Sequence, residues 1–310
     1  MAFLAVDLGG SHISCGLVEN RELVACEDFD VPNSERLGPV LPLLQGHLNK
    51  LMEGYRGSIQ GIGIGFCGVV DENQNCVAAT NGKYVDAPDL DLTAWSRESL
   101  SLTMRLANDA RLALRGEMCA GAACGEANVV MLTLGTGIGG VAAIDGKLPS
   151  GAHGFAAGLG GHTPVTLHGR VCTCGGRGCA ESEASGWVLP ILCREQPDFA
   201  SSALAHVDLN FRNLFQLAEN GDPVALRLRE HCLHVWAATT VAAIHSFDPA
   251  VVVFGGGIMQ AEDVILPSVR NYVERNAWTP RGAPRIVPAQ LGNRAALFGV
   301  ERLFQESPCA

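Results

Sequence analysis

At 310 residues, the chain is long enough for two domains, each with a hydrophobic core of its own. A formal net charge of −10 argues against nucleic acid or an anionic membrane as the main partner. The longest apolar stretch, around 235–244, is too short to span a bilayer. Because no basic region, apolar core and cleavage site open the sequence, we expect a cytoplasmic protein without a signal peptide.

The first feature along the chain is a glycine-rich turn between two apolar segments. Strands are expected at 3–7 and 13–18, and Asp7 lies where the first strand ends. Glycines let backbone N–H groups crowd around a phosphate, and a hydroxyl adds a donor. The residues that would bind phosphate are Gly9, Gly10 and Ser11. Asp7 is suited to hold a phosphate-bound Mg²⁺. The alternative interpretation of the glycine-rich segment is an ordinary tight turn that binds no phosphate.

A polar pair follows the next apolar strands. Strands are expected at 61–66 and 102–107, and Asn108-Asp109 comes directly before a helical pattern at 110–119. A carboxylate at Asp109 could accept the proton of an attacking hydroxyl while Asn108 orients the acceptor. The alternative is that one of the two is an ordinary helix N-cap.

The second half of the chain repeats the opening pattern. A strand at 129–134 is followed by a glycine-rich turn, a second strand at 141–144 and an expected two-residue hairpin turn at Asp145-Gly146. The turn residues that would bind phosphate are Gly135, Thr136 and Gly137. Two such turns between strands, one in each half, are a stronger indication of a phosphate site than either turn alone.

Cysteines cluster between residues 162 and 181. The set His162, Cys172, Cys174 and Cys179 matches the Cys₃His ligands of a closed, structural Zn²⁺ site. His168 is a rival for the fourth ligand. The alternative is a group of buried or disulfide-forming thiols.

The last features are a long helical pattern at 224–247, a strand at 250–254 and a helix at 295–304 that could pack on either domain. A third glycine run after the strand would let a nucleotide base approach the backbone, or form only a strand-to-helix turn. It consists of Gly255, Gly256 and Gly257. Strands alternating with helices predict α/β layers, and the repeated hairpin predicts two similar domains.

Together these motifs resemble the ROK family (repressors, open reading frames and kinases) of the actin, Hsp70 and sugar kinase superfamily, over essentially the whole chain. The resemblance is carried by Asp7–Ser11, Asn108–Ala110, Leu134–Gly140, Cys172–Glu181 and Asp248-Pro249 leading into 251–257. It implies two ribonuclease H-like domains around a central cleft. We expect the smaller domain to comprise 1–108 with about 293–310, and the larger one 109–292.

The resemblance also implies roles for single residues. Asp109 would be the catalytic base, ATP with Mg²⁺ the phosphoryl donor, and Zn²⁺ a structural ion beside the sugar. Contacts to the sugar or its surroundings would come from Asn81, Asn108, His162 and Glu181. A homodimer is expected because it is common in the family.

One departure from the family pattern concerns sugar recognition. Family members carry a Gly-Glu-Ile/Leu-Gly-His segment whose glutamate binds sugar hydroxyls, whereas here Gly158 occupies the acid position and the segment has an extra residue before His162. Two smaller departures are Ser11 for threonine and Cys67 for proline.

We expect an ATP-dependent kinase acting on O6 of a hexose or N-acetylhexosamine. One alternative is a sugar-binding protein that has lost catalysis. A second alternative, a repressor, would need a DNA-binding segment before the first turn, where only six residues precede Asp7.

Overall fold

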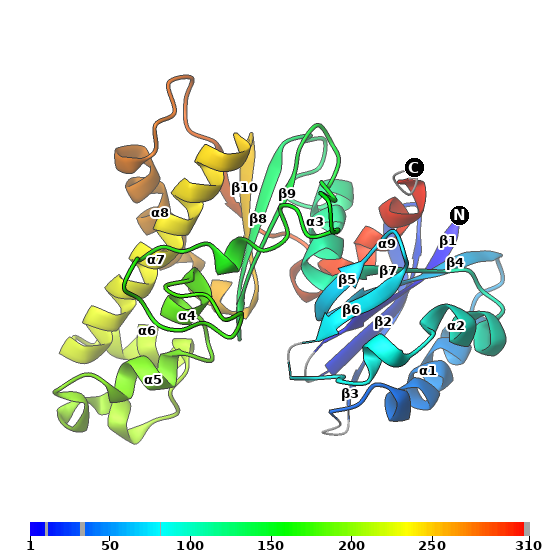
Figure 1. Ribbon diagram of the computed structural model, residues 1–310, viewed down its shortest axis with the longest axis horizontal. Coiled ribbons are helices and arrows are strands. Elements are labelled where there is room, and N and C mark those ends of the chain that lie inside the picture. Colours follow the sequence, from blue (N-terminus) through cyan, green and yellow to red (C-terminus); the bar gives the residue numbers. More distant parts are fainter. Residues whose placement is uncertain (10–11, 32–34, 81, 307–310) are drawn as a thin grey trace. The chain divides into compact units, whose positions relative to one another are not determined.

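The structure is a computed structural model that describes residues 1–9, 12–31, 35–80 and 82–306 (Figure 1). Gly10, Ser11 and Asn81, three of the predicted site residues, lie outside the described residues. The chain forms two compact units. Unit 1 comprises residues 1–125, 148–156 and 290–310, and unit 2 comprises 126–147 and 157–289. Among the described residues, no helix is long and apolar enough to cross a membrane.

Unit 1 is built on a five-stranded sheet of order β3-β2-β1-β4-β7. Strands β1, β2 and β3 form antiparallel pairs, and β4 and β7 run parallel to β1. The strands are β1 (Ala2–Leu8), β2 (His12–Glu19), β3 (Glu22–Asp30), β4 (Ile59–Phe66) and β7 (Met104–Asn108). A separate two-stranded ribbon consists of β5 (Gly68–Asp71) and β6 (Cys76–Thr80). The expected first hairpin is therefore confirmed.

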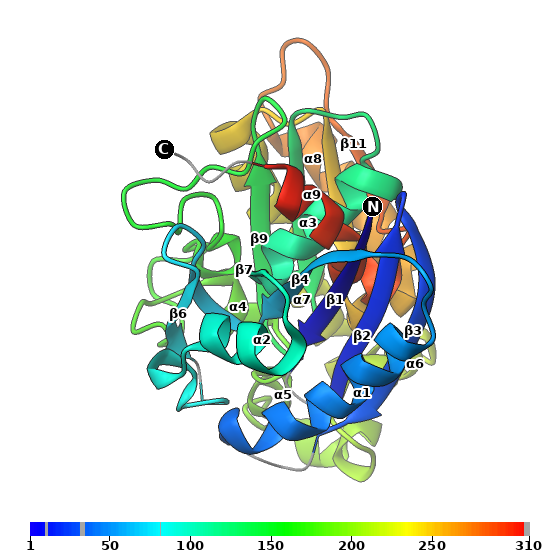
Figure 2. The same cartoon turned by 90° about the vertical axis from the view of Figure 1, so that its right-hand side faces the viewer.

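Helices cover both faces of this sheet, as the alternation of side chains along β1 requires. Leu4 and Val6 pack in one core cluster with apolar residues of α1 and α2, whereas Phe3 and Ala5 pack in another with α3 and α9. The helices are α1 (Leu41–Glu53), α2 (Leu92–Leu100), α3 (Asp109–Ala120) and α9 (Ala295–Gln305). Turning the molecule brings α1 and α2 in front of the strands (Figure 2).

Contacts within unit 1 place its boundary later in the chain than expected. Because Leu112 of α3 packs with Phe3 of β1 and Val300 of α9, α3 belongs to unit 1 rather than to the unit that follows. The boundary falls after Gly125, not after Asn108, and 148–156 returns to unit 1. The final helix packs on this unit, and the expected smaller domain of 1–108 with about 293–310 also included it.

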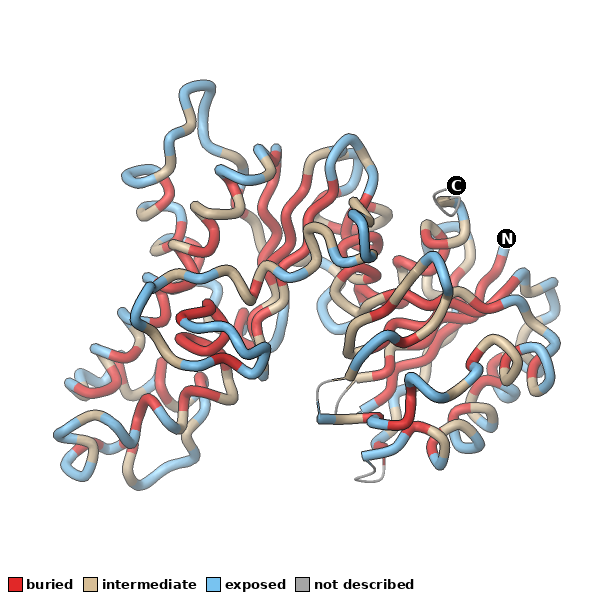
Figure 3. The backbone as a smooth tube through the Cα atoms, viewed as in Figure 1, coloured by how far each residue is buried: buried red, intermediate tan, exposed pale blue. Residues whose placement is uncertain are grey.

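Unit 2 is built on a four-stranded sheet of order β11-β10-β8-β9, in which only β9 is antiparallel to its neighbour. Strands β8, β9 and β10 are almost entirely buried, whereas β11 buries only Ile286 (Figure 3). The strands are β8 (Val129–Leu134), β9 (Ile138–Ala143), β10 (Val251–Gly255) and β11 (Arg285–Pro288). The helices are α4 (Ala180–Ala184), α5 (Leu189–Arg194), α6 (Phe211–Glu219), α7 (Pro223–Phe247) and α8 (Glu262–Asn276). The predicted α/β architecture is confirmed.

Local sequence explains several element ends in both units. Short 3₁₀ helices lie at Gly38–Val40, Ala87–Asp89, Gly160–His162, Phe199–Ser201, Ala203–His206, Gly257–Ala261 and Gly292–Arg294. Helix α7 starts after Asp222, whose carboxylate accepts from the amides of Val224 and Ala225. Asp145 and Gly146 have φ of 50° and 77°, as a type I′ turn requires, so the predicted hairpin turn is confirmed.

Candidate functional site

In unit 1, the predicted polar residues lie at one edge of the sheet. Asp7 of β1 pairs with Gly65 of β4, and the next residue of β4, Phe66, pairs with Asn108 of β7. These three strands are parallel, so their carboxyl ends meet at the same edge, where open α/β sheets bind ligands. The topology thereby places Asp7 near Asn108 and Asp109, although Asp7 is remote from this pair along the chain.

Asn108 is the N-cap of α3, as the simpler alternative proposed. Its Oδ1 accepts a hydrogen bond from the Arg111 amide at 3.1 Å. Its Nδ2 donates to the carbonyl of Gly68 at 3.0 Å and to Oδ1 of Asp109 at 2.8 Å. Capping therefore does not compete with a role at the site, because the cap itself orients the Asp109 carboxylate.

Both carboxyl groups at this edge ionise near neutral pH. Burial raises the pKa of Asp109 to about 6, against the lowering effect of hydrogen bonds from the Ala110 amide and Asn108. Burial also raises the pKa of Asp7 to about 7, and the charge of Asp109 adds to this effect. A carboxylate with a pKa near the working pH is suited to act as a general base.

Two neighbouring residues were not predicted to belong to this edge. Burial, followed by the charge of Asp109, raises the pKa of the Cys67 thiol to about 12, so this thiol stays neutral. Tyr84 is fully buried, and its hydroxyl donates to the carbonyl of Gly9 at 3.2 Å. Tyr84 thus supports the first glycine-rich turn from a distance of 75 residues along the chain, which no local pattern indicates.

In unit 2, the second glycine-rich turn and the third glycine run meet at one pocket of about 810 Å³. Of the predicted residues, Gly135, Thr136 and Gly257 line it. Backbone hydrogen bonds from a later segment fix the turn: the Gly186 amide donates to the Gly135 carbonyl at 2.9 Å, and the Trp187 amide donates to the Thr136 carbonyl at 3.0 Å. The other lining residues were not predicted: Gly186, Trp187, Leu209, Asn210, Phe211, Arg212, Phe215, Gln216, Glu219, Arg229, Ile258, Gln260, Ala261, Asp263 and Val264.

The third glycine run contributes both to the packing of β10 beside β8 and to the lining of the pocket. Gly256 has a φ of +92°, and a Cβ atom there would overlap the backbone of Leu134 at the end of β8. Only glycine permits this close passage of β10's end beside β8. Gly257, by contrast, has open space around its missing side chain and faces the pocket, whereas Gly255 and Gly256 do not line it.

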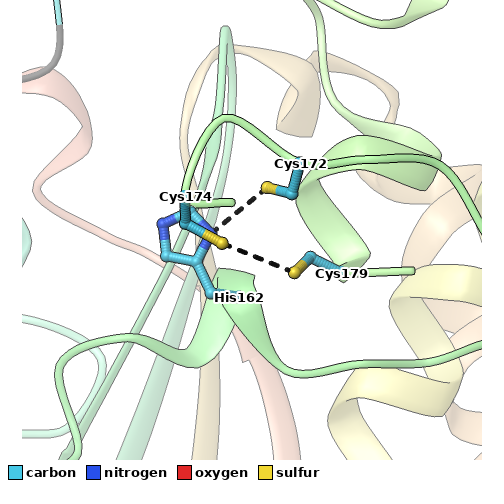
Figure 4. Close-up of side chains that lie close together, drawn as sticks. All are labelled: His162, Cys172, Cys174 and Cys179. Carbon is cyan, nitrogen blue, oxygen red and sulfur yellow. Dashed lines mark hydrogen bonds between the residues drawn. The ribbon is translucent and has the colours of Figure 1, made fainter. Parts of the chain in front are cut away.

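The predicted metal ligands also come together in unit 2 (Figure 4). One ligand atom from each of His162, Cys172, Cys174 and Cys179 lies within 4.8 Å of the others. Cys172 Sγ is 3.5 Å from His162 Nδ1, and the sulfurs of Cys174 and Cys179 are 3.8 Å apart. Sulfurs on a tetrahedral Zn²⁺, with Zn–S near 2.3 Å, would be ~3.8 Å apart, so the geometry fits that ion.

The structure distinguishes between the alternatives for this cluster. His162 lies in it, whereas His168 is exposed and is not one of its members. The cysteines of the described part of the chain are free, so the disulfide alternative is not supported there. The four ligands leave no open position, which is typical of a structural site.

Glu181, expected near the sugar, connects the cysteine loop to the second glycine-rich turn. It is buried, and its Oε2 accepts from the amide of Ile138 at 3.1 Å. Its Oε1 accepts from the hydroxyl of Thr173, between two cysteines, at 3.3 Å. This carboxylate therefore carries structural hydrogen bonds, whatever else it contacts.

The segment 155–162 contains no acidic side chain. Ala157 has a left-handed φ of 53°, and its carbonyl accepts from the Ala142 amide of β9 at 2.9 Å. A Cβ atom at Gly161 would overlap the carbonyl of Ile138. The lack of a side chain at Gly161 therefore lets the backbone of this segment pack directly on β9.

The chain is similar to known proteins over nearly its whole length. The family model for the ROK family matches residues 3–307. A glucokinase of Streptomyces coelicolor is 31% identical over 98% of this chain and 97% of its own. A solved ROK family glucokinase from Streptomyces griseus, in complex with glucose and AMPPNP, is 28% identical with a TM-score of 0.81, covering 99% of this chain and all of that one. The xylose repressor of Bacillus spizizenii is 26% identical over 79% of this chain, which covers 61% of the repressor.

Proposed function

Because this chain belongs to the ROK family, we propose that it is a sugar kinase that transfers the γ-phosphoryl group of ATP to a sugar hydroxyl. The observation that carries the proposal is the pair of carboxyl groups, Asp7 and Asp109, at the carboxyl edge of the unit 1 sheet. The glucokinase relatives, which match along their whole length, support the same class of reaction.

In this proposal, Asp109 accepts the proton of the sugar hydroxyl while that oxygen bonds to the γ-phosphorus and the bond from phosphorus to the ADP oxygen breaks. Asn108 holds the carboxylate through its 2.8 Å hydrogen bond. O6 of a hexose or N-acetylhexosamine is the acceptor we favour. The residues proposed to surround the sugar are Asn81, Asn108, His162 and Glu181.

The nucleotide would occupy the unit 2 pocket. The second turn and the third glycine run offer backbone at this pocket, and the first turn in unit 1 would add donors to the phosphates. A bound Mg²⁺ would neutralise charge on the phosphates, and Asp7 would hold it directly or through water. Zn²⁺ would be held by His162 and the three cysteines, where it orders the loop without entering the reaction.

A screen of ATP consumption against hexoses and amino sugars tests this function, with the position of the new phosphate determined by NMR. Phosphorylation of at least one sugar supports it. If nucleotide binds but no sugar is phosphorylated, the second candidate, a sugar-binding protein without catalysis, replaces it. The observation favouring that candidate is the absence of a carboxylate from 155–162.

A further inference from the structure

Two buried side chains of α3, Arg111 and Glu117, hold the places where the chain passes between its two units. The chain crosses at 125/126, 147/148, 156/157 and 289/290. Near each crossing, at most three positions away along the chain, a residue of unit 1 is hydrogen-bonded to Arg111 or Glu117. In chain order these residues are Ala122, Pro149, Ala156 and Gln290. The helix that bears them begins with Asp109.

Arg111 holds both ends of the unit 1 segment 148–156. Its Nη1 donates to the carbonyl of Pro149 at 3.1 Å and to the carbonyl of Ala156 at 3.2 Å. Its Nε pairs with Glu72 at 2.6 Å, and the guanidinium group is buried. A single planar group with several donors therefore joins the two ends of this segment to the first turn of α3.

Glu117 holds the remaining two crossings. It is fully buried, and its Oε2 accepts from the amides of Ala122 at 2.7 Å and Gln290 at 3.2 Å. Its Oε1 accepts from the amide of Leu291 at 2.8 Å. Three amide donors satisfy the buried carboxylate, and Ala122 and Gln290 flank the first and last crossings.

At two crossings, the residue on one side is hydrogen-bonded within unit 1 and the residue next to it is hydrogen-bonded within unit 2. Ala156 is held by Arg111, while the carbonyl of Ala157 accepts from β9 in unit 2 at 2.9 Å. Ala289 donates to Phe254 of β10 at 2.7 Å, while Gln290 is held by Glu117. Any hinge movement at these points must be absorbed by one or two backbone torsions, as hinges commonly are.

We infer that Arg111 and Glu117 are positioning residues that fix all four crossings to the helix of the proposed base. Segment 155–162, which we place near the sugar, starts beside the Ala156 anchor. Loosening the anchors therefore weakens sugar binding more than nucleotide binding. This kinetic consequence rests on the proposed function, whereas the anchoring itself is measurable without any substrate.

The first experiment measures hydrogen–deuterium exchange in the ligand-free, full-length protein carrying Arg111→Lys. Lysine keeps the charge but loses the planar set of donors. Arg105→Lys is the matched control, because Arg105 Nη1 also donates to two carbonyls of unit 1, those of Leu303 and Glu306, away from any crossing. We expect exchange of peptides covering 148–156 to accelerate about tenfold only in Arg111→Lys, through local opening. Equal exchange in the two variants overturns the inference.

The second variant, Glu117→Gln, places an amide group against N–H donors and should accelerate exchange at 289–292. Its control is Asp86→Asn, because Asp86 accepts from the amides of Leu37 and Gly38 within unit 1. Both test variants should raise the KM for sugar about tenfold, with nucleotide affinity unchanged. A lowered melting temperature without these changes assigns the residues a purely structural role and overturns the inference. Faster exchange in a protein whose wild type phosphorylates no sugar supports the anchoring and rejects the proposed function instead.

Discussion

The charge of Asp109 acts on Asp7: after burial, it is the second cause that raises the pKa of the Asp7 carboxyl to about 7. The two groups come from β1 and from the residue after β7, which lie on either side of β4. A cation bound between phosphate and Asp7 would lower both pKa values, because it favours the ionised carboxylates. The free protein therefore holds these groups in an electrostatically unfavourable pair, as is common where a ligand is to bind.

Replacing the proposed base tests its role directly. Asp109→Asn should lower the rate of phosphorylation by about 10²–10⁴-fold, the usual effect of removing a general base. Nucleotide affinity should be unchanged, because the pocket proposed to bind the nucleotide lies in unit 2, whereas Asp109 lies in unit 1. Steady-state kinetics and titration with a fluorescent nucleotide measure the two effects. Turnover within a few-fold of wild type would exclude Asp109 as the base.

The raised pKa values predict how folding stability depends on pH. Asp7 and Asp109 ionise near pH 3.8 when unperturbed but near 7 and 6 in the folded protein. Between these values the folded chain retains protons that the unfolded chain has lost, so their contribution to stability decreases as pH rises from about 4 to about 7. Asp7→Asn should therefore be more stable than wild type at pH 8, by on the order of 1–3 kcal/mol, and similar at pH 4.

Chemical denaturation without nucleotide or Mg²⁺ measures this difference. Asp89→Asn is the control, because Asp89 is exposed in the same unit. An Asp7→Asn protein that is less stable than wild type at pH 8 would show that the ionised carboxylate stabilises the fold.

Metal analysis tests the cysteine cluster. Purified protein should contain about one zinc per chain, and Cys174→Ala should contain much less, because one of four ligands is lost. Cys174 is exposed, so its truncation leaves no cavity in the core, and exposed Cys124→Ala is the matched control. A chelator should lower the melting temperature of wild type and of Cys124→Ala, but not that of Cys174→Ala. Equal zinc content in all three proteins would refute the ligand assignment.

Gly256 and Gly257 have different roles in the third glycine run, one in the fold and one at the pocket. Gly256→Ala should lower the free energy of unfolding by about 1–3 kcal/mol, because of its left-handed φ and the overlap with Leu134. Gly257→Ala should be within about 0.5 kcal/mol of wild type, because its Cβ atom meets no neighbour. Since Gly257 faces the pocket, its alanine variant should instead bind nucleotide more weakly. Thermal denaturation and nucleotide titration measure both effects, and equal destabilisation would contradict the assignment.

Restoring a carboxylate tests the departure at residue 158. One charge-assisted hydrogen bond to a sugar hydroxyl is worth about 1.5–3 kcal/mol, so Gly158→Glu should lower the KM for glucose by about tenfold or more. Gly158→Gln, which lacks the charge, should give a smaller change. Initial rates over a range of glucose concentrations provide the measurement. A KM that stays constant in both variants would mean that the extra glycine directs the side chain away from the sugar.

Much of the fold follows from short-range patterns in the sequence. Short apolar runs on either side of a glycine-rich turn predicted the hairpins at 3–18 and 129–144, because such runs bounded by turn residues are typical of buried strands. The pair Asn108-Asp109 before an apolar periodic segment predicted the start of α3. The spacing of three cysteines predicted the cluster, because ligands close in sequence need only a turn to reach one ion.

Other features depend on partners that are distant along the chain, so only the tertiary structure decides them. The sequence favoured His162 as the fourth ligand and left His168 as an alternative, and among the described residues the fold brings His162, not His168, to the cysteines. The expected boundary after Asn108 separated α3 from the first unit, whereas the structure joins α3 to it through long-range contacts of Leu112 with β1 and α9. The pocket lining between 186 and 264 and the Tyr84 bond to Gly9 likewise have no local signal. Burial and pairing arise when remote segments pack together, and local periodicity does not encode which segments those are.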